Sequence, residues 1–224
     1  MIYLKTVKSI ITDLAKLDEQ GRAEEIDIKK ENKEMREIIT FIKRTMRKNN
    51  LVSLSAPAIG YNKRIFCVDF SDKEIKTFIN PLVTNLSGLE LTREVCSSIP
   101  GKEFIRPRHS TIDIIYTNPQ GIIKSNQFKG LAATVIQHEL DHLDGITLAD
   151  IGLEIEPDFD EGTEEEKFEI INMYLDSLDL AREDLIKDFQ KDENLKKEYE
   201  ADKFMEMLGQ GKIKLEAVQA VKEE

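Results

Sequence analysis

Two histidines four residues apart bracket a glutamate in the stretch Gln137-His138-Glu139-Leu140-Asp141-His142. In a helix with about 3.6 residues per turn, His138 and His142 lie on one face, so both imidazoles can reach one metal ion. Glu139 then lies beside that ion, where a carboxylate can act as a general base. The same spacing also arises by chance on the solvated face of a charged helix, so the motif alone leaves both interpretations open.

A catalytic zinc site usually has a third protein ligand and keeps its fourth position for water. The remaining histidine, His109, lies in the basic, turn-like run Arg106-Pro107-Arg108-His109-Ser110, which is typical of an exposed loop rather than a ligand site. Cys67 lies in an alternating apolar run that predicts a strand, where a free cysteine most often packs as a small core residue. Cys96 stands between a strand-like segment and the turn Pro100-Gly101, where its sulfur can point into a cleft.

Three ordered motifs resemble those of the peptide deformylases, whose patterns are roughly G-x-G-L-A-A-x-Q, E-G-C-L-S and Q-H-E-x-D-H. The third motif is complete here, at 137–142. The second is kept at 94–98, with Val95 for the family's glycine and Ser97 for its leucine. The first is the most altered. The segment 51–60 keeps the skeleton Leu-x-Ala-Pro-x-Ile-Gly, but it lacks both early glycines, and Ala58 replaces the glutamine. The resemblance covers about residues 25 to 150.

The resemblance implies that Cys96, His138 and His142 hold one divalent metal ion. A thiolate with two imidazoles suits Zn²⁺ or Fe²⁺, and Ni²⁺ or Co²⁺ are expected as substitutes. The resemblance also implies that Glu139 accepts a proton from water as it attacks the formyl carbonyl, and then protonates the departing amine. The expected reaction is hydrolysis of the linear amide of N-formylmethionine on nascent polypeptides, which releases formate.

Ala58 is the most consequential departure from the family pattern. By the resemblance, the charge on the formyl oxygen is met by the metal ion, the backbone N–H of Ser97 and the missing glutamine. Loss of one such donor typically lowers the rate about 100-fold to 1000-fold. A hydroxyl of Ser53, Ser55 or Ser97 could replace it, although hydroxyls in loops are more often simply solvated.

The lost glycines affect the expected substrate groove. The resemblance implies that the peptide lies extended beside the first motif and adds to the sheet edge through main-chain hydrogen bonds. Val52, Ser53 and Val95 are therefore the expected substrate-binding residues. Because glycine allows another chain to approach closely, the side chains of Ser53 and Val95 should narrow or re-aim this groove.

These features lead to one principal hypothesis and two alternatives. The principal one is a metal-dependent deformylase with reduced activity or a different peptide preference. The first alternative is a catalytically weak or inactive deformylase-like metal-binding protein that acts through protein–protein contacts. The second is a metallopeptidase of the H-E-x-x-H type, but such helices take their third ligand from downstream, whereas Cys96 lies upstream.

The composition predicts one soluble globular domain with an appendage. The chain has 224 residues, of which 40% are hydrophobic and 33% charged. Its apolar runs fall far short of the roughly 18 residues needed to span a bilayer, and its start lacks the pattern of a signal peptide, so we expect a cytoplasmic protein without membrane contact. The two widely spaced cysteines do not suggest a disulfide framework, which fits a reducing compartment.

The net charge of −11 comes from the C-terminal part of the chain. Residues 154–224 carry 23 acidic and 10 basic residues, whereas residues 1–153 carry 20 and 22. An acidic surface argues against direct binding of nucleic acid, because neutralising phosphates requires the opposite sign. Any ribosome contact should therefore be transient or use the near-neutral body.

The predicted fold class is α+β, with antiparallel β-sheets packed around the metal-binding helix. A catalytic domain is expected at 1–153, followed by an acidic, mainly helical extension at 154–224. Apolar spacing predicts an amphipathic helix over 32–47 and the metal-binding helix over 131–143. The predicted strands are 65–70, 77–79, 89–94, 111–116 and 122–128, separated by turn signals at Asn80-Pro81, Ser87-Gly88 and 118–121.

The extension shows the signals of amphipathic helices. Thr163 and Glu166 have the spacing of a capping box, and one apolar stripe follows at Phe168, Ile171, Leu175 and Leu178. Further apolar stripes occur at 185–189 and 204–208. Such stripes are usually buried, so we favour packing on the catalytic body or a homodimer contact over a separate partner site.

Overall fold

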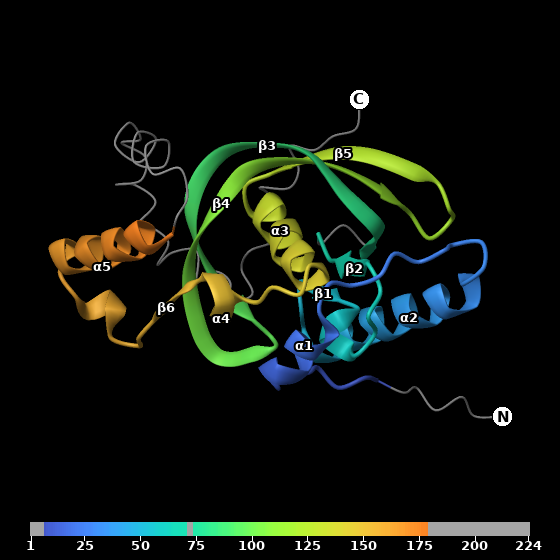
Figure 1. The fold of residues 1–224 in the computed structure, drawn as a ribbon, viewed down its shortest axis with the longest axis horizontal. Helices are drawn as coiled ribbons and strands as arrows, with labels where there is room; N and C mark the ends of the chain where they lie inside the picture. Colours follow the sequence, from blue (N-terminus) through green and yellow to red (C-terminus); the bar gives the residue numbers. More distant parts are fainter. Residues whose placement is uncertain (1–6, 71–73, 179–224) are drawn as a thin grey trace.

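The computed structural model of the chain describes residues 7–70 and 74–178. In this part, six strands form one antiparallel sheet in the order β1 (Ser53–Ser55), β2 (Ile65–Val68), β3 (Lys76–Cys96), β4 (Ile99–Thr117) and β5 (Ile123–Lys129), with β6 (Leu153–Ile155) paired to β4. The long strands β3 and β4 curve around helix α3 (Leu131–Leu143), as Figure 1 shows. The predicted α+β fold is confirmed.

Helix α3 is anchored by its apolar face. It begins after Gly130, whose φ of 53° suits glycine, and it ends where the sequence predicted. Ala133, Ile136 and Leu143 are fully buried in a cluster with aromatic and β-branched residues of the sheet. This apolar face fixes the rotation of the helix, so the opposite face with its two histidines is held in one orientation.

A second core forms where helix α2 (Asn32–Asn49) covers the β1–β2 end of the sheet, with the short helices α1 (Leu14–Gln20) and η1 (Pro57–Ile59) nearby. The helix buries Met35, Ile38 and Ile42 completely. It confirms the helix predicted over 32–47 and continues for two more residues. The left-handed conformation of Asn50, with φ 53°, ends it.

Two predicted turns are wrong, because β3 continues through both Asn80-Pro81 and Ser87-Gly88. Asn80 has φ 47°, and the register shifts between Ile79 and Leu82. The Asn80 side chain bonds both the N–H and the C=O of Ile26, at 3.0 and 2.9 Å. Gly88 is needed for a close approach, since a Cβ there would lie 2.1 Å from Ser110 Oγ. The turn signals therefore mark irregularities within one strand.

The prediction of an exposed loop at 106–110 is also wrong, because this run lies inside β4 and pairs with β3. Arg108 is only 3% exposed. Pro107 lies between the stretches of β4 that pair with β6 and with β5. One edge of the strand has no strand partner there, which is where a sheet tolerates proline.

The described part of the extension packs against the sheet. After α4 (Leu148–Ile151) and β6 come η2 (Phe159–Glu161) and α5 (Glu164–Ser177), which starts with the predicted capping box at Thr163. Ile171, Tyr174 and Leu175 of α5 are buried in a cluster with Ile105 of β4. Phe168 is 50% exposed, so its predicted place in the buried stripe is wrong.

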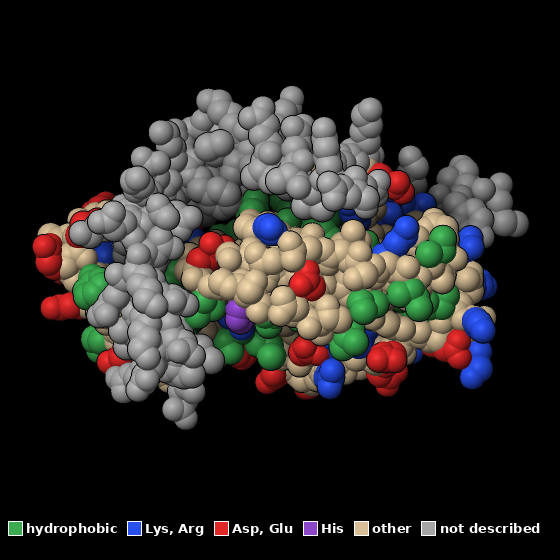
Figure 2. All heavy atoms as spheres, turned by 90° about the horizontal axis from the view of Figure 1, so that it is seen from above, with side chains coloured by type: hydrophobic (Ala, Val, Ile, Leu, Met, Phe, Trp, Pro, Cys, Tyr) green, Lys and Arg blue, Asp and Glu red, His purple; other side chains and the backbone are tan. Residues whose placement is uncertain are grey.

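The predicted boundary between residues 153 and 154 falls within β6, and the apolar stripes at 185–189 and 204–208 lie outside the described residues. Figure 2 shows acidic side chains at the α5 end of the molecule, with both signs mixed toward the α2 end. Across residues 7–70 and 74–178, no helix combines the length and apolar character needed to cross a membrane.

Candidate metal centre

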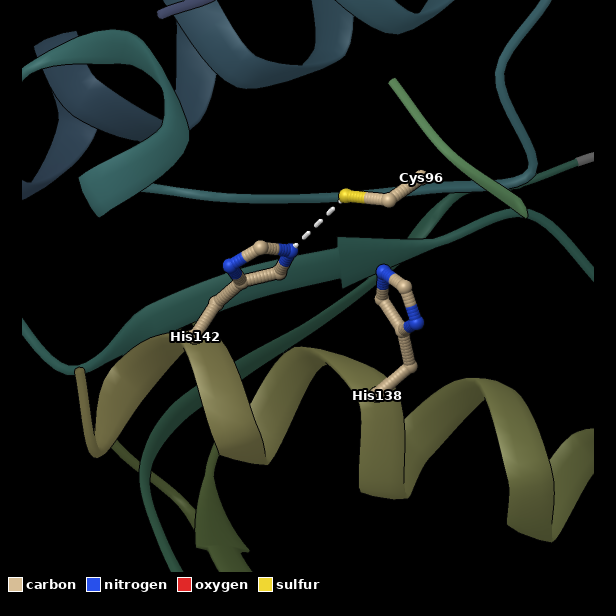
Figure 3. A group of neighbouring side chains, drawn as sticks. All are labelled: Cys96, His138 and His142. Atoms are coloured by element: carbon tan, nitrogen blue, oxygen red, sulfur yellow. Dashed lines mark hydrogen bonds between the residues drawn. The ribbon is translucent and has the colours of Figure 1, made fainter. Parts of the chain in front are cut away.

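The three predicted ligands lie together between the end of β3 and the face of α3 that carries the two histidines. The Sγ of Cys96 lies 3.2 Å from Nε2 of His142. Ligand atoms of Cys96, His138 and His142 all fall within 4.8 Å of one another. The two imidazole rings are 5.0 Å apart, at 73° to each other, and Figure 3 shows both rings and the sulfur pointing toward one another.

The geometry and the donor atoms fit a divalent ion. Metal–ligand bonds of about 2.3 Å to sulfur and 2.0–2.1 Å to nitrogen put neighbouring ligand atoms of a tetrahedral site roughly 3.4–3.6 Å apart. The separation of 3.2 Å between Cys96 and His142 is close to that value. One thiolate and two imidazoles suit Zn²⁺ or Fe²⁺ rather than Mg²⁺ or Ca²⁺.

The remaining histidine and cysteine lie elsewhere. His109 is part of β4, where its backbone N–H donates to Gln137 Oε1 at 3.1 Å and its C=O accepts from Gln137 Nε2 at 2.8 Å. These two bonds tie α3 to β4. Cys67 is fully buried in β2 beside Thr77, and burial raises the pKa of its thiol to about 12. Cys67 is therefore a core residue, in agreement with the sequence analysis.

His138 is oriented by Glu94, which lies two residues before Cys96 on β3. His138 Nδ1 is 2.9 Å from Glu94 Oε2, so its Nε2 remains for a metal ion. Arg108 makes a bidentate contact with the same carboxylate, donating from Nε to Oε1 at 2.6 Å and from Nη2 to Oε2 at 2.8 Å. Burial raises the pKa of Glu94, but the hydrogen bonds from Arg108 and His138 outweigh it and hold the pKa well below its usual range. Glu94 is thus a carboxylate, and Nδ1 of His138 carries the proton.

Asp141 of α3 extends this network. Its Oδ2 accepts from Arg108 Nη1 at 2.6 Å and also from Arg106. Arg108 thus holds both Glu94, two residues before Cys96, and Asp141, which lies between the two histidines in sequence. Arg106 of the same strand holds Asp141 as well. Arg106, Arg108 and Asp141 were not predicted from the sequence as parts of the site. The alternation of Arg106 and Arg108 in phase with buried Ile112 was an available signal.

Coupled pKa shifts show how closely the ligand groups interact. Burial raises the pKa of the Cys96 thiol, but hydrogen bonds with His138 and His142 outweigh it and lower the pKa to about 6. Burial lowers the pKa of His138, but Cys96 and Glu94 raise it to about 10. These shifts favour a thiolate beside a protonated imidazole, and a metal cation can take the place of that proton.

Glu139 faces the same space and is only 3% exposed. Its Oε2 has no hydrogen-bond partner among the residues that the structure describes. An unpaired buried carboxylate oxygen is costly, so it implies a partner such as a water molecule or a substrate proton. Glu139 can therefore accept a proton in the cavity beside the ligand groups.

A cavity of about 350 Å³ opens beside these residues. Its walls come from the first-motif segment, the end of β3 and α3. They include Val52, Ser53, Ala58, Val95, Ser97 and Thr134. Residues of β1 and of the end of β3 both line the cavity, and in the part of the chain that the structure describes β1 pairs only with β2, while β2 pairs with β3 only at 76–79.

All three predicted substrate-binding residues, Val52, Ser53 and Val95, line this cavity. Val52 and Val95 are 43% and 57% exposed. Ala58 lines it too, at the position where the family resemblance expects glutamine. Of the three candidate hydroxyls, those of Ser53 and Ser97 belong to cavity-lining residues. Ser55 is fully buried outside the cavity lining, and within the described ranges its Oγ has no hydrogen-bond partner.

The polypeptide deformylase family model matches residues 12–154. The chain belongs to this family. Peptide deformylases are hydrolases that act on formylmethionyl peptides with one divalent metal ion. The match includes all three ligand candidates and Glu139, and it ends before η2 and α5.

Curated relatives agree with the family match. The peptide deformylase of Dictyoglomus thermophilum is 38% identical over 127 residues, which are 57% of this chain and 82% of that protein. The peptide deformylase of Fusobacterium nucleatum is 36% identical over 129 residues, which are 55% of this chain and 72% of that protein.

Solved structures share the fold. The peptide deformylase from Thermotoga maritima superimposes with a TM-score of 0.60 and 27% identity, covering 68% of this chain and 99% of that one. A probable peptide deformylase from synechococcus phage S-SSM7 gives a TM-score of 0.58 and 31% identity, covering 64% of this chain and 98% of that one.

Proposed function

We propose that this protein hydrolyses the formyl amide at the N-terminus of formylmethionyl peptides. The observation that carries the proposal is the grouping of Cys96, His138 and His142 beside Glu139, whose Oε2 has no partner among the described residues. The group lies at the wall of a peptide-sized cavity in a member of the deformylase family. The products are formate and a free methionine amino group on the nascent chain.

The proposed metal ligands are Sγ of Cys96 and Nε2 of His138 and His142, for one Fe²⁺ or Zn²⁺ ion, with Ni²⁺ or Co²⁺ as substitutes. A bound ion supplies a water molecule of lowered pKa and polarises the formyl carbonyl. Glu94 keeps the His138 ring turned so that Nε2 faces the site, and the buried Arg108 keeps Glu94 charged. This orientation is in place before substrate arrives.

Glu139 is the proposed general base and acid. Its unpaired Oε2 takes a proton as water attacks the formyl carbon. The same carboxyl group then gives that proton to the methionine nitrogen as the C–N bond breaks. Burial at 3% exposure keeps bulk water from competing for the proton.

The proposed oxyanion donor of the chain itself is the backbone N–H of Ser97, which follows directly after Cys96. Ala58 lines the cavity but has no polar side-chain atom. A family member with glutamine there would have one more donor, so we propose a lower rate for this protein, by about 100-fold to 1000-fold.

The substrate is proposed to lie extended along the free edge of β1. Within residues 7–70 and 74–178 this strand pairs only with β2, so its other edge can bond a peptide main chain. Ser53 and Val95 line the cavity from its two sides, at positions where the family pattern has glycine. Their side chains should favour small residues after the methionine.

The alternative of a metal-binding protein without catalysis predicts a closed site that excludes substrate. The cavity beside the ligand group favours the hydrolase instead. The metallopeptidase alternative is disfavoured because Cys96, upstream of the helix, completes the group of ligand atoms.

The test is formate release from formyl-Met-Ala-Ser by protein reconstituted anaerobically with Fe²⁺. Wild type should release formate, and Glu139→Gln should abolish release while binding one metal ion per chain. Glu154→Gln is the matched control, because Glu154 pairs with Lys102 on the surface at 2.8 Å and is not one of the residues that line the cavity. Metal-loaded wild-type protein that releases no formate, even with glutamine at position 58, would overturn the proposal.

A further inference from the structure

Arg93 connects the cavity to the C-terminal extension. It lies on β3 three residues before Cys96, and it lines the cavity with its side chain 14% exposed. Its guanidinium makes a bidentate contact with Asp160 of η2, donating from Nη1 to Oδ1 at 2.8 Å and from Nη2 to Oδ2 at 2.9 Å. Nη2 also donates to Glu103 of β4 at 3.0 Å. Asp160 lies beyond the part of the chain that the family model matches.

These bonds fix the direction of the Arg93 side chain. A guanidinium that meets a carboxylate through two parallel bonds has one geometry, unlike a single ion pair. The bond to Glu103 fixes the group to β4 as well. Arg93 is thus a cavity-lining residue whose guanidinium is held by two carboxylates, those of Asp160 and Glu103.

The cavity-lining segment 93–97, called the rim, needs such an anchor, because the backbone pairing at the end of β3 is irregular. The register with β4 shifts between Val95 and Cys96, and β2 pairs only with the opposite end of β3. The residues 93–97 all line the cavity. Side-chain ties therefore carry a larger share of the positioning of this segment than they do in a regular strand.

We propose that Asp160 is a positioning residue for the substrate groove, which it holds in shape through Arg93. This inference rests on the proposed deformylase function, and it adds that the extension takes part in substrate binding. Neither Arg93 nor Asp160 belongs to the group of ligand atoms, so the chemical step should not depend on them. Loosening the rim should weaken peptide binding and leave the bond-breaking step intact.

The test compares Asp160→Asn with two controls. Asparagine keeps the size of the side chain but loses the charge and one acceptor, so the bidentate contact with Arg93 is lost. Asp160→Glu keeps the charge and should behave nearly like the wild type. Tyr174→Phe removes another tie of the extension, the hydroxyl bond to Ile151 O at 2.6 Å, and leaves the Arg93 contact in place.

The first readout is hydrogen exchange of the backbone amides at 93–97, which needs no catalytic activity. Exchange should speed up in Asp160→Asn and stay at the wild-type rate in Tyr174→Phe. Unchanged exchange in Asp160→Asn overturns the inference whether or not the wild type releases formate. A wild type without formate release defeats the proposed function alone, so the two failures are distinguishable.

The second readout is the kinetics of formate release from formyl-Met-Ala-Ser. Asp160→Asn should raise KM about two- to fivefold, the scale of a partly exposed ion pair, with kcat unchanged. Asp160→Glu should return KM toward the wild-type value. A fall in kcat at constant KM, or an equal change in Tyr174→Phe, contradicts the positioning role.

Discussion

Glu94 Oε2 lies 2.9 Å from His138 Nδ1 and, at the same time, 2.8 Å from Arg108 Nη2, so one carboxylate oxygen joins a ligand candidate to a buried arginine. The orientation of His138 on α3 thus depends on Glu94 of β3 and, through it, on Arg108 of β4. Such partners of metal ligands typically account for 10-fold to 100-fold in metal affinity.

Glu94→Gln should lower the affinity for Zn²⁺ by about 10-fold to 100-fold, because the neutral amide holds the His138 ring less firmly. It should also destabilise the fold by up to about 3 kcal/mol, since Arg108 loses one of the two carboxylates that pair with its buried charge and keeps Asp141. Competition with a chelator and denaturant unfolding of the metal-free protein measure the two effects separately. Glu154→Gln is the surface control, and equal metal affinity in both variants would refute the role of Glu94.

Cys96→Ala should abolish tight binding of one metal ion per chain. Cys67→Ala is the matched control, because that thiol is fully buried beside Thr77 and is not one of the grouped ligand residues. It should keep the metal and lose only the stability that a small core cavity costs, about 1 kcal/mol. Elemental analysis after gel filtration gives the metal content. A Cys96→Ala protein that keeps its metal would favour the metallopeptidase alternative.

Ala58→Gln should raise kcat for formate release by up to about 100-fold to 1000-fold, because the added amide N–H can meet the developing negative charge. Ala58 is 2% exposed but lines the cavity, so the longer side chain has space on that side. Steady-state kinetics at matched metal content decide the question. Ala58→Leu adds similar bulk without a donor and should give no gain; a gain in that variant would trace the effect to packing.

The contact between Arg93 and Asp160 should make stability depend on pH in acid. The hydrogen bond from Arg93 lowers the pKa of Asp160 from its ordinary value of 3.8. The folded protein therefore holds this proton less tightly than the unfolded chain, so the stabilisation is complete above about pH 5 and disappears as the pH falls through the lowered pKa. Glu103 and Lys167 also act on this pair of charges.

The measurable consequence is a stability difference between wild type and Asp160→Asn. It should be constant from pH 7 to about 5 and should close below the ordinary pKa of the carboxyl group. Urea unfolding at each pH supplies the free energies. A difference that persists unchanged at pH 2.5 would show that the charge of Asp160 does not carry it.

The helices were predictable because their signals are local. Helix α3 shows alternating apolar and polar faces over 131–143, and the structure begins and ends it at those residues. The strand breaks were not predictable in the same way. Asn80-Pro81 has the composition of a turn, but Asn80 is held in its conformation by Ile26, which is 54 positions away in sequence.

Within the site, residue types identified the ligand candidates, whereas their supports depend on the tertiary fold. Cys96, His138 and His142 stand out because the chain has three histidines and two cysteines in all. Arg106 and Arg108 looked like exposed loop residues, since isolated buried arginines are unfavourable. Only the approach of α3 to β4 supplies Asp141 as their partner, and that contact has no local sequence signal.

The pairing of β6 with β4 also has a consequence for how the chain can be divided. Leu153, Glu154 and Ile155 cover the edge of β4 at 103–105, close to the Arg93 contact. Cutting the chain at residue 153 would uncover a row of main-chain N–H and C=O groups, which is a template for pairing between molecules. A shortened protein should therefore associate into aggregates, because the start of the acidic extension covers this edge in the full chain.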